Sequence, residues 1–231
     1  MLEELKKEVW ETNLSLKRHG LIILTWGNAS GIDREKGLMV IKPSGVPYET
    51  MQPSDMVVMD LEGKVIEGNL KPSSDAKTHI ELYKAFPKIG SIIHTHSTYA
   101  TCFAQAGMEI PPLGTTHADL FHGPVPITRE LSLEEVNEDY EGNTGKVIIE
   151  RFANLDYLAL PGVLAKNHGP FVWGHSPKEA LVNALTLEEI AKMAYLTLSL
   201  NKNSKPMQQY LLDKHYERKH GPKAYYGQKR R

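Results

Sequence analysis

The sequence predicts an α/β fold in which helices cover a mixed or antiparallel sheet. Segments with helical and strand-like apolar spacing alternate along the 231 residues, and several strand-like pairs are joined by turns short enough for hairpins. With 41% hydrophobic residues, the chain can bury a sizeable core. Its length fits one large domain or two small ones, and no low-complexity linker forces a split. Because the two kinds of element interleave, we expect sheet and helices to share one core.

Helices are expected where apolar residues recur every three to four positions and a capping residue marks an end. The N-terminal helix should end at Gly20, a residue favoured just after a helix. Ser132 and Glu135 have the spacing of a capping box, and Ser176 followed by Pro177 is a strong helix start. The expected helical segments are residues 2–20, 77–86, 97–106, 132–154 and 176–198.

Strands are expected where short apolar runs are bounded by turn residues. Leu61-Glu62-Gly63 should form the turn of a hairpin, and Asn167-His168-Gly169-Pro170 a tight turn between two late strands. We expect Gly27-Asn28 to form a turn directly after the first strand. The expected strands are residues 21–26, 38–42, 56–60, 64–67, 92–96, 163–165 and 171–174.

Composition excludes several classes of function. The formal net charge of −1 gives no general attraction to nucleic acid or to an anionic membrane, and no run of 18 apolar residues is present to span a bilayer. The first residues mix charges and lack an apolar signal core, so a cytoplasmic protein is expected. The single Cys102 cannot form an intrachain disulfide. Seven Lys or Arg residues follow position 213, and Tyr225-Tyr226 among them suggests that this basic tail docks.

His94-Thr95-His96 is the most informative short motif. Ile92 and Ile93 indicate a strand that leads into it, and side chains two positions apart on a strand point to the same face. Two imidazoles so placed can hold one divalent metal at about 2.0–2.1 Å. The alternative is that one or both are exposed or hydrogen-bonded loop residues. The strand-like approach favours the metal site.

Two histidines leave a metal short of ligands, and spacing alone does not choose the others. Asp75 precedes a predicted helix and could be a ligand, a general base or a helix cap. His168 stands out because it lies in the predicted tight turn between two strands. The complete set of candidates is His79, His117, His122, His168, His175, Asp75 and Asp119.

Three short polar turns could bind an anion through backbone N–H groups. They are Gly27-Asn28, Ser44-Gly45 and Ser73-Ser74, and the last precedes a predicted helix. Lys42 could add a positive charge beside Ser44. Each turn is common by itself, and none matches a P-loop or a dinucleotide fingerprint.

Six motifs together resemble the class II aldolase/epimerase family, almost from end to end of the chain. They are Thr25-Trp26-Gly27-Asn28, Lys42-Pro43-Ser44-Gly45, Pro72-Ser73-Ser74-Asp75, His94-Thr95-His96, Gly114-Thr115-Thr116-His117-Ala118-Asp119 and His168-Gly169-Pro170. The C-terminal segments 213–216, 218–221 and 225–227 resemble those of epimerase members in particular. Two departures from the family pattern are a shortened or rewritten stretch at 152–160 and Leu120 in place of an aromatic residue.

The resemblance implies a three-layer αβα fold with a central, mostly antiparallel sheet, formed by one domain over residues 1–231. It implies a Zn²⁺ ion, with Mn²⁺ or Co²⁺ as alternatives, held by His94, His96 and His168 with Asp75 as ligand or acid/base group. The residues implied to bind the phosphate or the sugar are Gly27, Asn28, Lys42, Ser44, Gly45, Ser73 and Ser74.

The resemblance also implies a homotetramer whose active sites lie between subunits. Residues 205–231 would dock on a neighbouring subunit, so that His215 and Tyr226 serve the neighbour's metal site. Asp119 and Tyr226 would be the acid/base groups. Thr115 and Glu141 complete the implied catalytic set.

The implied activity is epimerisation of a sugar phosphate, interconverting L-ribulose 5-phosphate and D-xylulose 5-phosphate in pentose catabolism of arabinose or ascorbate. The C3–C4 bond would break in a retro-aldol step and re-form with the opposite configuration. One alternative is an aldolase of the same family that cleaves a ketose phosphate such as L-fuculose 1-phosphate. Another is a non-catalytic scaffold of the adducin type, against which the histidines together with Asp119 argue.

Overall fold

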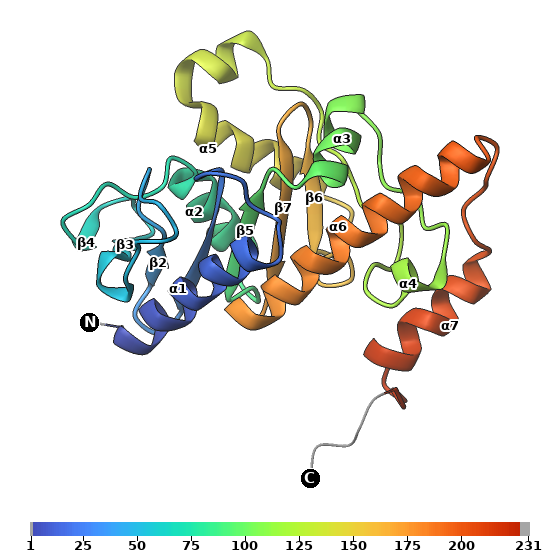
Figure 1. The fold of residues 1–231 in the computed structure, drawn as a ribbon, viewed down its shortest axis with the longest axis horizontal. Coiled ribbons are helices and arrows are strands. Elements are labelled where there is room, and N and C mark those ends of the chain that lie inside the picture. The colour runs from blue at the N-terminus through green and yellow to red at the C-terminus, as the bar shows by residue number, and fades with distance from the viewer. Residues whose placement is uncertain (1, 227–231) are drawn as a thin grey trace.

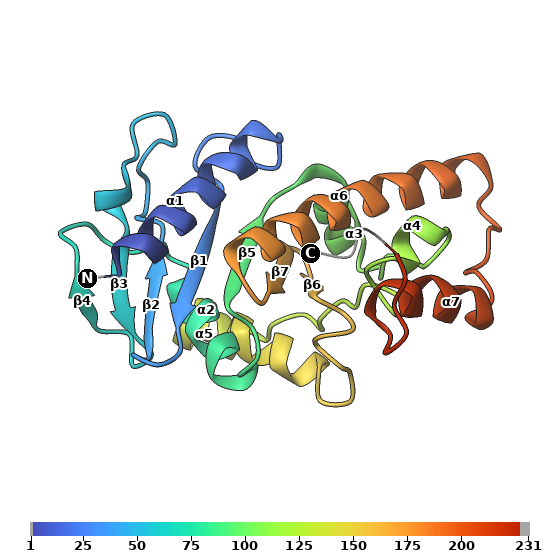
Figure 2. The same cartoon turned by 90° about the horizontal axis from the view of Figure 1, so that it is seen from below.

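The computed structural model describes residues 2–226 and places a twisted sheet between two layers of helices (Figures 1 and 2). Within these residues the sheet has seven strands in the order β4-β3-β2-β1-β5-β7-β6. Every pair of neighbouring strands is antiparallel, which confirms the predicted fold class. The strands are β1 (Gly27–Asp33), β2 (Leu38–Ile41), β3 (Val57–Asp60), β4 (Val65–Glu67), β5 (Ser91–Thr95), β6 (Gly162–Ala165) and β7 (Gly169–Gly174).

Helices α1 and α6 cover one face of the sheet, and α2 and α5 cover the other, as Figure 2 shows. The helices are α1 (Glu3–Arg18), the 3₁₀ turn η1 (Pro53–Asp55), α2 (Ala76–Ala85), α3 (Thr98–Ala106), α4 (Thr115–Ala118), α5 (Leu133–Arg151), α6 (Pro177–Leu200) and α7 (Gln209–His220). No helix in the described part of the chain has both the length and the apolar character needed to cross a bilayer.

Small residues let α6 lie close to the sheet. Ala180, Ala184 and Ala191 are buried on its inner face, as their helical spacing predicts. A Cβ atom on Gly174 of β7 would lie only 2.6 Å from the backbone nitrogen of Ala180, so the contact requires glycine there. The Ser176 hydroxyl caps the helix by accepting a hydrogen bond from the Glu179 N–H.

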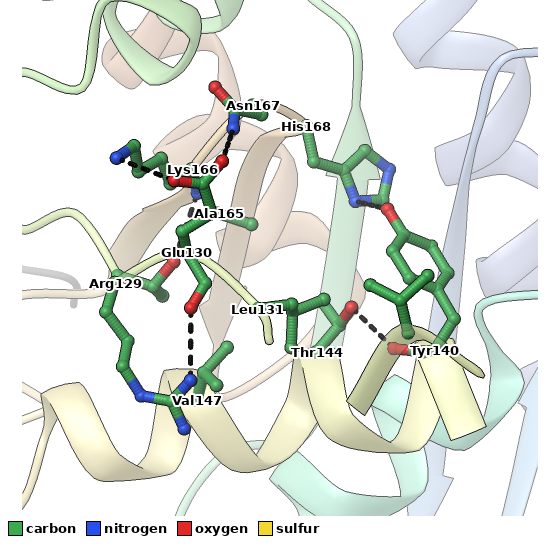
Figure 3. A pocket seen from close by; sticks show the side chains of 12 residues that line it. Arg129, Glu130, Leu131, Tyr140, Thr144, Val147, Ala165, Lys166, Asn167 and His168 are labelled. Atoms are coloured by element: carbon green, nitrogen blue, oxygen red, sulfur yellow. Dashed lines mark hydrogen bonds and ion pairs between the residues drawn. The ribbon is translucent and has the colours of Figure 1, made fainter. Parts of the chain in front are cut away.

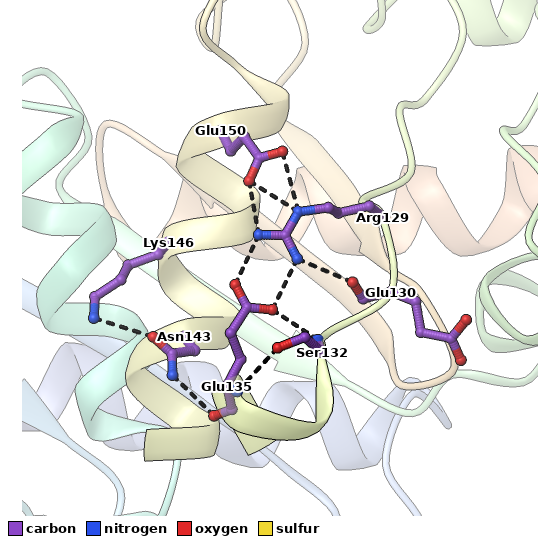
Figure 4. Close-up of polar contacts among 7 residues, drawn as sticks. All are labelled: Arg129, Glu130, Ser132, Glu135, Asn143, Lys146 and Glu150. Carbon is purple, nitrogen blue, oxygen red and sulfur yellow. Dashed lines mark hydrogen bonds and ion pairs between the residues drawn. The ribbon is translucent and has the colours of Figure 1, made fainter. Parts of the chain in front are cut away.

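Helix α5 has a kink that breaks it into two pieces. Ser132 and Glu135 form the predicted capping box at its start, but Asp139 has an extended backbone with φ of −161°. The Asp139 carboxylate pairs with Lys77 of α2 at 2.7 Å, which holds the kink against the neighbouring helix. As Figure 4 shows, the Arg129 guanidinium binds both Glu135 and Glu150, one from each piece. Directly after the kink, Tyr140 and Glu141 line the same cavity as His94 and His96 at the end of strand β5.

The first predicted strand is wrong. Residues 21–26 form an irregular loop, and β1 begins instead at Gly27, where we expected a turn. Pairing with β2 and β5 on its two sides stabilises β1, and Gly31 lets α1 lie against it, since a Cβ there would come within 2.8 Å of Leu5. The loop leaves Leu24 with a positive φ of 55° and 65% exposed, and Trp26 53% exposed.

Helices α4 and α7 pack together at one end of the molecule, alongside the C-terminal half of α6 (Figures 1 and 2). Leu212 of α7 is buried in this packing. The segment that we expected to dock on a neighbouring subunit thus contacts its own chain through α7, and its last residues, 227–231, lie outside the described part.

Candidate active site

The antiparallel order brings four chain segments to one end of the sheet. Strands β1 and β7 begin there, whereas β2 and β5 end there. Gly27 and Asn28 of β1 pair with Thr95 and His94 of β5. His168 lies in the turn that leads into β7, which is the other neighbour of β5. Residues far apart in the sequence therefore converge because of strand direction alone.

Three of the predicted metal ligands meet at this end. One ring nitrogen from each of His94, His96 and His168 lies within 4.8 Å of the other two. The ring centroids are 4.6 Å apart for His94 and His168, and 4.9 Å apart for His94 and His96. His94 is fully buried, His168 is half-buried and His96 is exposed to the solvent side. Solvent therefore reaches the cluster at His96.

All three imidazoles are held in the neutral form that binds metal. Burial lowers the pKa of His94 to about 3, and the neighbouring His96 adds to this shift. Burial, and then the proximity of His94, lowers the pKa of His168 to about 3. Burial also lowers the pKa of His96. The lone pairs are therefore free of protons at neutral pH.

The donor set fits a divalent cation. His94 Nδ1 lies 3.0 Å from the Pro170 carbonyl oxygen, which can accept only if Nδ1 carries the proton, so Nε2 is left as the ligand. Asp75 occupies the N-cap position of α2, yet its side chain makes no capping bond. Its carboxylate instead accepts a 2.6 Å hydrogen bond from Asn28 Nδ2, on the wall of the same cavity. The helix-cap interpretation of Asp75 is thus wrong.

A cavity of about 330 Å³ joins the histidine cluster to the three polar turns. It contains twelve of the sixteen site residues that the sequence indicates. These are Gly27, Asn28, Lys42, Ser44, Gly45, Ser73, Ser74, Asp75, His94, His96, Glu141 and His168. A phosphate at the turns and a metal at the histidines would share one space.

Lys42 is a lysine that lines this cavity. It is 2% exposed, and its Nζ donates to the carbonyl oxygens of Pro43 (3.0 Å) and Val46 (3.1 Å). No carboxylate pairs with it among residues 2–226. Burial lowers the pKa of Lys42 to about 8, so most of the side chains still carry a charge at neutral pH. This uncompensated charge suits a phosphate dianion.

The other four candidates gather elsewhere, around α4 and α7. Arg218 donates two hydrogen bonds of 2.8 Å to the Asp119 carboxylate, Lys219 pairs with it at 3.1 Å, and His215 lies 3.3 Å away. Burial raises the pKa of Asp119, but these three partners outweigh burial and keep the pKa below its ordinary value. Thr115 lies one helical turn before Asp119 on α4.

Tyr226 belongs to the same cluster. Its ring lies 4.7 Å from the Arg218 guanidinium carbon and 4.5 Å from Lys219 Nζ, and 59% of the residue is exposed. In the described chain, Asp119, Thr115, His215 and Tyr226 do not line the histidine cavity. Each chain thus carries the predicted site as two separate parts, one at the sheet end and one at the α4–α7 end.

Tyr140 is a site residue that sequence reasoning missed. It follows the kink in α5, lines the histidine cavity and reaches His168, whose Nδ1 lies 3.3 Å from the Tyr140 hydroxyl (Figure 3). Behind this contact is a second cavity of about 180 Å³ between α5 and the turn before β7. The kink depends on the Asp139–Lys77 pair, so no local pattern in the sequence marks Tyr140. Thr25, Trp26 and Pro43 complete the lining.

The chain belongs to the class II aldolase and adducin family, whose N-terminal-domain profile matches residues 7–195. Among its relatives, it is 55% identical over 228 residues to the L-ribulose-5-phosphate 4-epimerase UlaF of Salmonella paratyphi C (strain RKS4594), covering 99% of this chain and 100% of that protein.

Solved structures of the family share the fold. An L-fuculose 1-phosphate aldolase superposes with a TM-score of 0.80 at 28% identity, over 93% of this chain and 95% of the aldolase. The L-fuculose-1-phosphate aldolase of Thermus thermophilus has a TM-score of 0.63 at 26% identity, over 88% of this chain and 98% of that one.

Proposed function

We propose that the protein is an L-ribulose-5-phosphate 4-epimerase, which interconverts L-ribulose 5-phosphate and D-xylulose 5-phosphate. The similarity to the Salmonella epimerase over the whole chain carries this proposal. The cavity supports it, because it combines an anion-binding end at Lys42 with a metal-binding end at the histidines.

The reaction must invert a carbon whose C–H proton is not acidic. Breaking the C3–C4 bond in a retro-aldol step avoids removing that proton. His94, His96 and His168 would hold a divalent cation, which we propose to be Zn²⁺, and its positive charge would stabilise the negative charge that develops on the ketose oxygens. The polar turns and Lys42 hold the phosphate, so that the aldehyde fragment can rotate and present its other face without leaving.

Two acid/base groups are needed, because the C4 oxygen points in opposite directions in the two epimers. We assign these roles to Asp119 and Tyr226. Since both lie at the α4–α7 end of their own chain, they would act in the cavity of a second copy. A cyclic homotetramer in which each α4–α7 end closes the next cavity satisfies this requirement.

An aldolase is the second candidate. The similarity to an L-fuculose 1-phosphate aldolase, with a TM-score of 0.80, favours the same bond-breaking step. The two activities differ in the fate of the fragments, because an aldolase releases them and an epimerase retains them.

A coupled assay tests the proposal. Purified protein is incubated with L-ribulose 5-phosphate, and D-xylulose 5-phosphate is measured with and without a chelator. We expect rapid conversion that the chelator abolishes and that added Zn²⁺, Mn²⁺ or Co²⁺ restores. Accumulation of dihydroxyacetone and glycolaldehyde phosphate instead would favour the aldolase, and inactivity of the metal-loaded protein would refute both.

Replacing Tyr226 by phenylalanine should slow turnover about 10²–10³-fold, because the variant lacks the hydroxyl that exchanges a proton with the C4 oxygen. Metal content, measured by mass spectrometry, should stay at the wild-type level. Tyr225→Phe is the matched control, since its ring lies instead over Lys214, and it should retain normal turnover. Normal turnover of Tyr226→Phe would remove this residue from the mechanism.

The KM for L-ribulose 5-phosphate should depend on pH through Lys42. The Lys42 charge is nearly complete a pH unit or more below its pKa of about 8 and is lost as the pH rises through that value. A phosphate monoester gains its second charge near pH 6. KM should therefore be lowest near pH 7, about double by pH 8, and rise about tenfold by about pH 9. A Lys42→Arg variant, which stays charged, should show no such rise; a rise in that variant would assign the effect to another group.

A further inference from the structure

Tyr48 is a buried aromatic residue within an otherwise exposed loop. Only 2% of it is exposed, although Ser44, Gly45, Glu49 and Thr50 around it face the solvent. It does not line the cavity and has no part in the chemistry described above. Its two polar contacts, however, both reach residues that do line the cavity.

The first contact is with Lys42. Lys42 Nζ lies 4.7 Å from the centroid of the Tyr48 ring. A ring face attracts an ammonium group, and the attraction grows where water is excluded. Two carbonyl oxygens and the ring hold the ammonium group in place, and no carboxylate within residues 2–226 neutralises its charge.

The second contact is with Gly27. The Tyr48 hydroxyl donates a 2.8 Å hydrogen bond to the Gly27 carbonyl oxygen. Burial raises the pKa of Tyr48, so the hydroxyl keeps its proton as the donor. Gly27 pairs with Thr95, which lies between the two histidines of the His94-Thr95-His96 motif. Tyr48 thus contacts both Lys42, beside the anion-binding turns, and Gly27, whose pairing with β5 helps to position His94 and His96.

We propose that Tyr48 is a positioning residue for the phosphate site, holding the Lys42 ammonium group in place and fixing the distance between the phosphate and the histidine cluster. The second part of this proposal, the distance between the phosphate and the histidine cluster, rests on the proposed function. The phosphate site itself rests only on the cavity and can be tested apart from any turnover.

Two Tyr48 variants separate the two contacts. Tyr48→Phe keeps the ring beside Lys42 and loses the bond to Gly27, whereas Tyr48→Leu loses both. Tyr83→Phe is the matched control, because Tyr83 is also fully buried and its hydroxyl binds Ser30 at 2.7 Å, but it does not line the cavity. All three variants are compared with the wild type by thermal unfolding, so that losses of stability are known.

The first readout is the affinity for inorganic phosphate, measured by calorimetry on the full chain after removal of metal. We expect Tyr48→Leu to weaken binding about tenfold and Tyr48→Phe about threefold, with Tyr83→Phe unchanged. Wild-type affinity in Tyr48→Leu, or an equal loss in Tyr83→Phe, would overturn the proposal. So would a wild-type protein that does not bind phosphate. If Tyr48→Leu does not fold, Tyr48→Phe decides.

The second readout is the release of free dihydroxyacetone during turnover of L-ribulose 5-phosphate. A loosely held phosphate lets the aldehyde fragment escape, so both Tyr48 variants should release several times more dihydroxyacetone per epimerisation than the wild type and Tyr83→Phe. A fall in rate without added release would contradict the positioning role. If the wild type does not epimerise at all, the proposed function fails, and the phosphate measurement still judges Tyr48.

Discussion

A His94→Ala variant should lose its bound metal and its activity together. His94 is the buried member of the histidine cluster, and its Nδ1 contact with Pro170 leaves Nε2 as the nitrogen that a metal could bind. Without it, two imidazoles remain, one of them exposed. We expect metal affinity and turnover each to fall by about 10³-fold or more. Metal content after gel filtration and the epimerase assay measure the two effects.

Two further variants control this experiment. His94→Asn retains most of the side-chain volume, so a loss in both variants is not a consequence of the empty space. His175→Ala removes a histidine that binds the Lys88 carbonyl oxygen and does not line the cavity, and it should keep both metal and activity. Full metal occupancy in folded His94→Ala would refute this metal site.

Mixing two inactive variants should restore activity if each active site is built from two chains. His94→Ala destroys the sheet-end part, and Asp119→Asn destroys the α4–α7 part. After the two proteins are unfolded together and refolded at equal amounts, a site is complete when an intact cavity meets an intact Asp119. In a random cyclic tetramer this holds for about a quarter of the sites. Activity should therefore return to about a quarter of the wild-type level.

The double variant, carrying both substitutions in one chain, is the control. When the double variant is refolded with wild-type protein, a site is complete only where two wild-type chains are neighbours, so the double variant contributes to no complete site. If the two single variants remain inactive after mixing while each is folded and tetrameric, the site is not shared between chains. A monomer in solution, measured by light scattering, would contradict the proposed assembly directly.

Most of the fold follows from local patterns, but helices α4 and α7 lie outside the predicted helical segments, and the first strand is misplaced for a physical reason. Capping residues such as Ser132 and Ser176 lie where the predicted helices begin. The apolar run at 21–26 predicts a strand, but the strand in fact forms at Gly27–Asp33, a segment with weak strand preference. Pairing on both sides and the glycine contacts with α1 decide this, and both are long-range properties that a local pattern does not contain.

The site residues that could be predicted from the sequence are those whose positions depend on local geometry. The spacing of His94 and His96 indicates a shared face without any comparison, whereas His168 could be chosen from seven candidates only through the resemblance to the family. Asp75 differs again, because its contact with Asn28 depends on how β1 and α2 meet. The roles of Asp119, His215 and Tyr226 depend on a second chain and remain predictions.

The strand order has a consequence for substrate size. Lys42 directly follows β2, Gly27 begins β1 and His94 lies on β5, and these three strands are consecutive in the sheet. In the proposed complex, with the phosphate at Lys42 and the metal at His94, the sugar would span about two inter-strand steps, roughly 10 Å, and the ladder hydrogen bonds prevent this spacing from increasing. Because the sheet fixes the distance between Lys42 and His94, a ligand longer by one carbon would have to bend within the cavity. Only the loops around the cavity could change conformation to accommodate it.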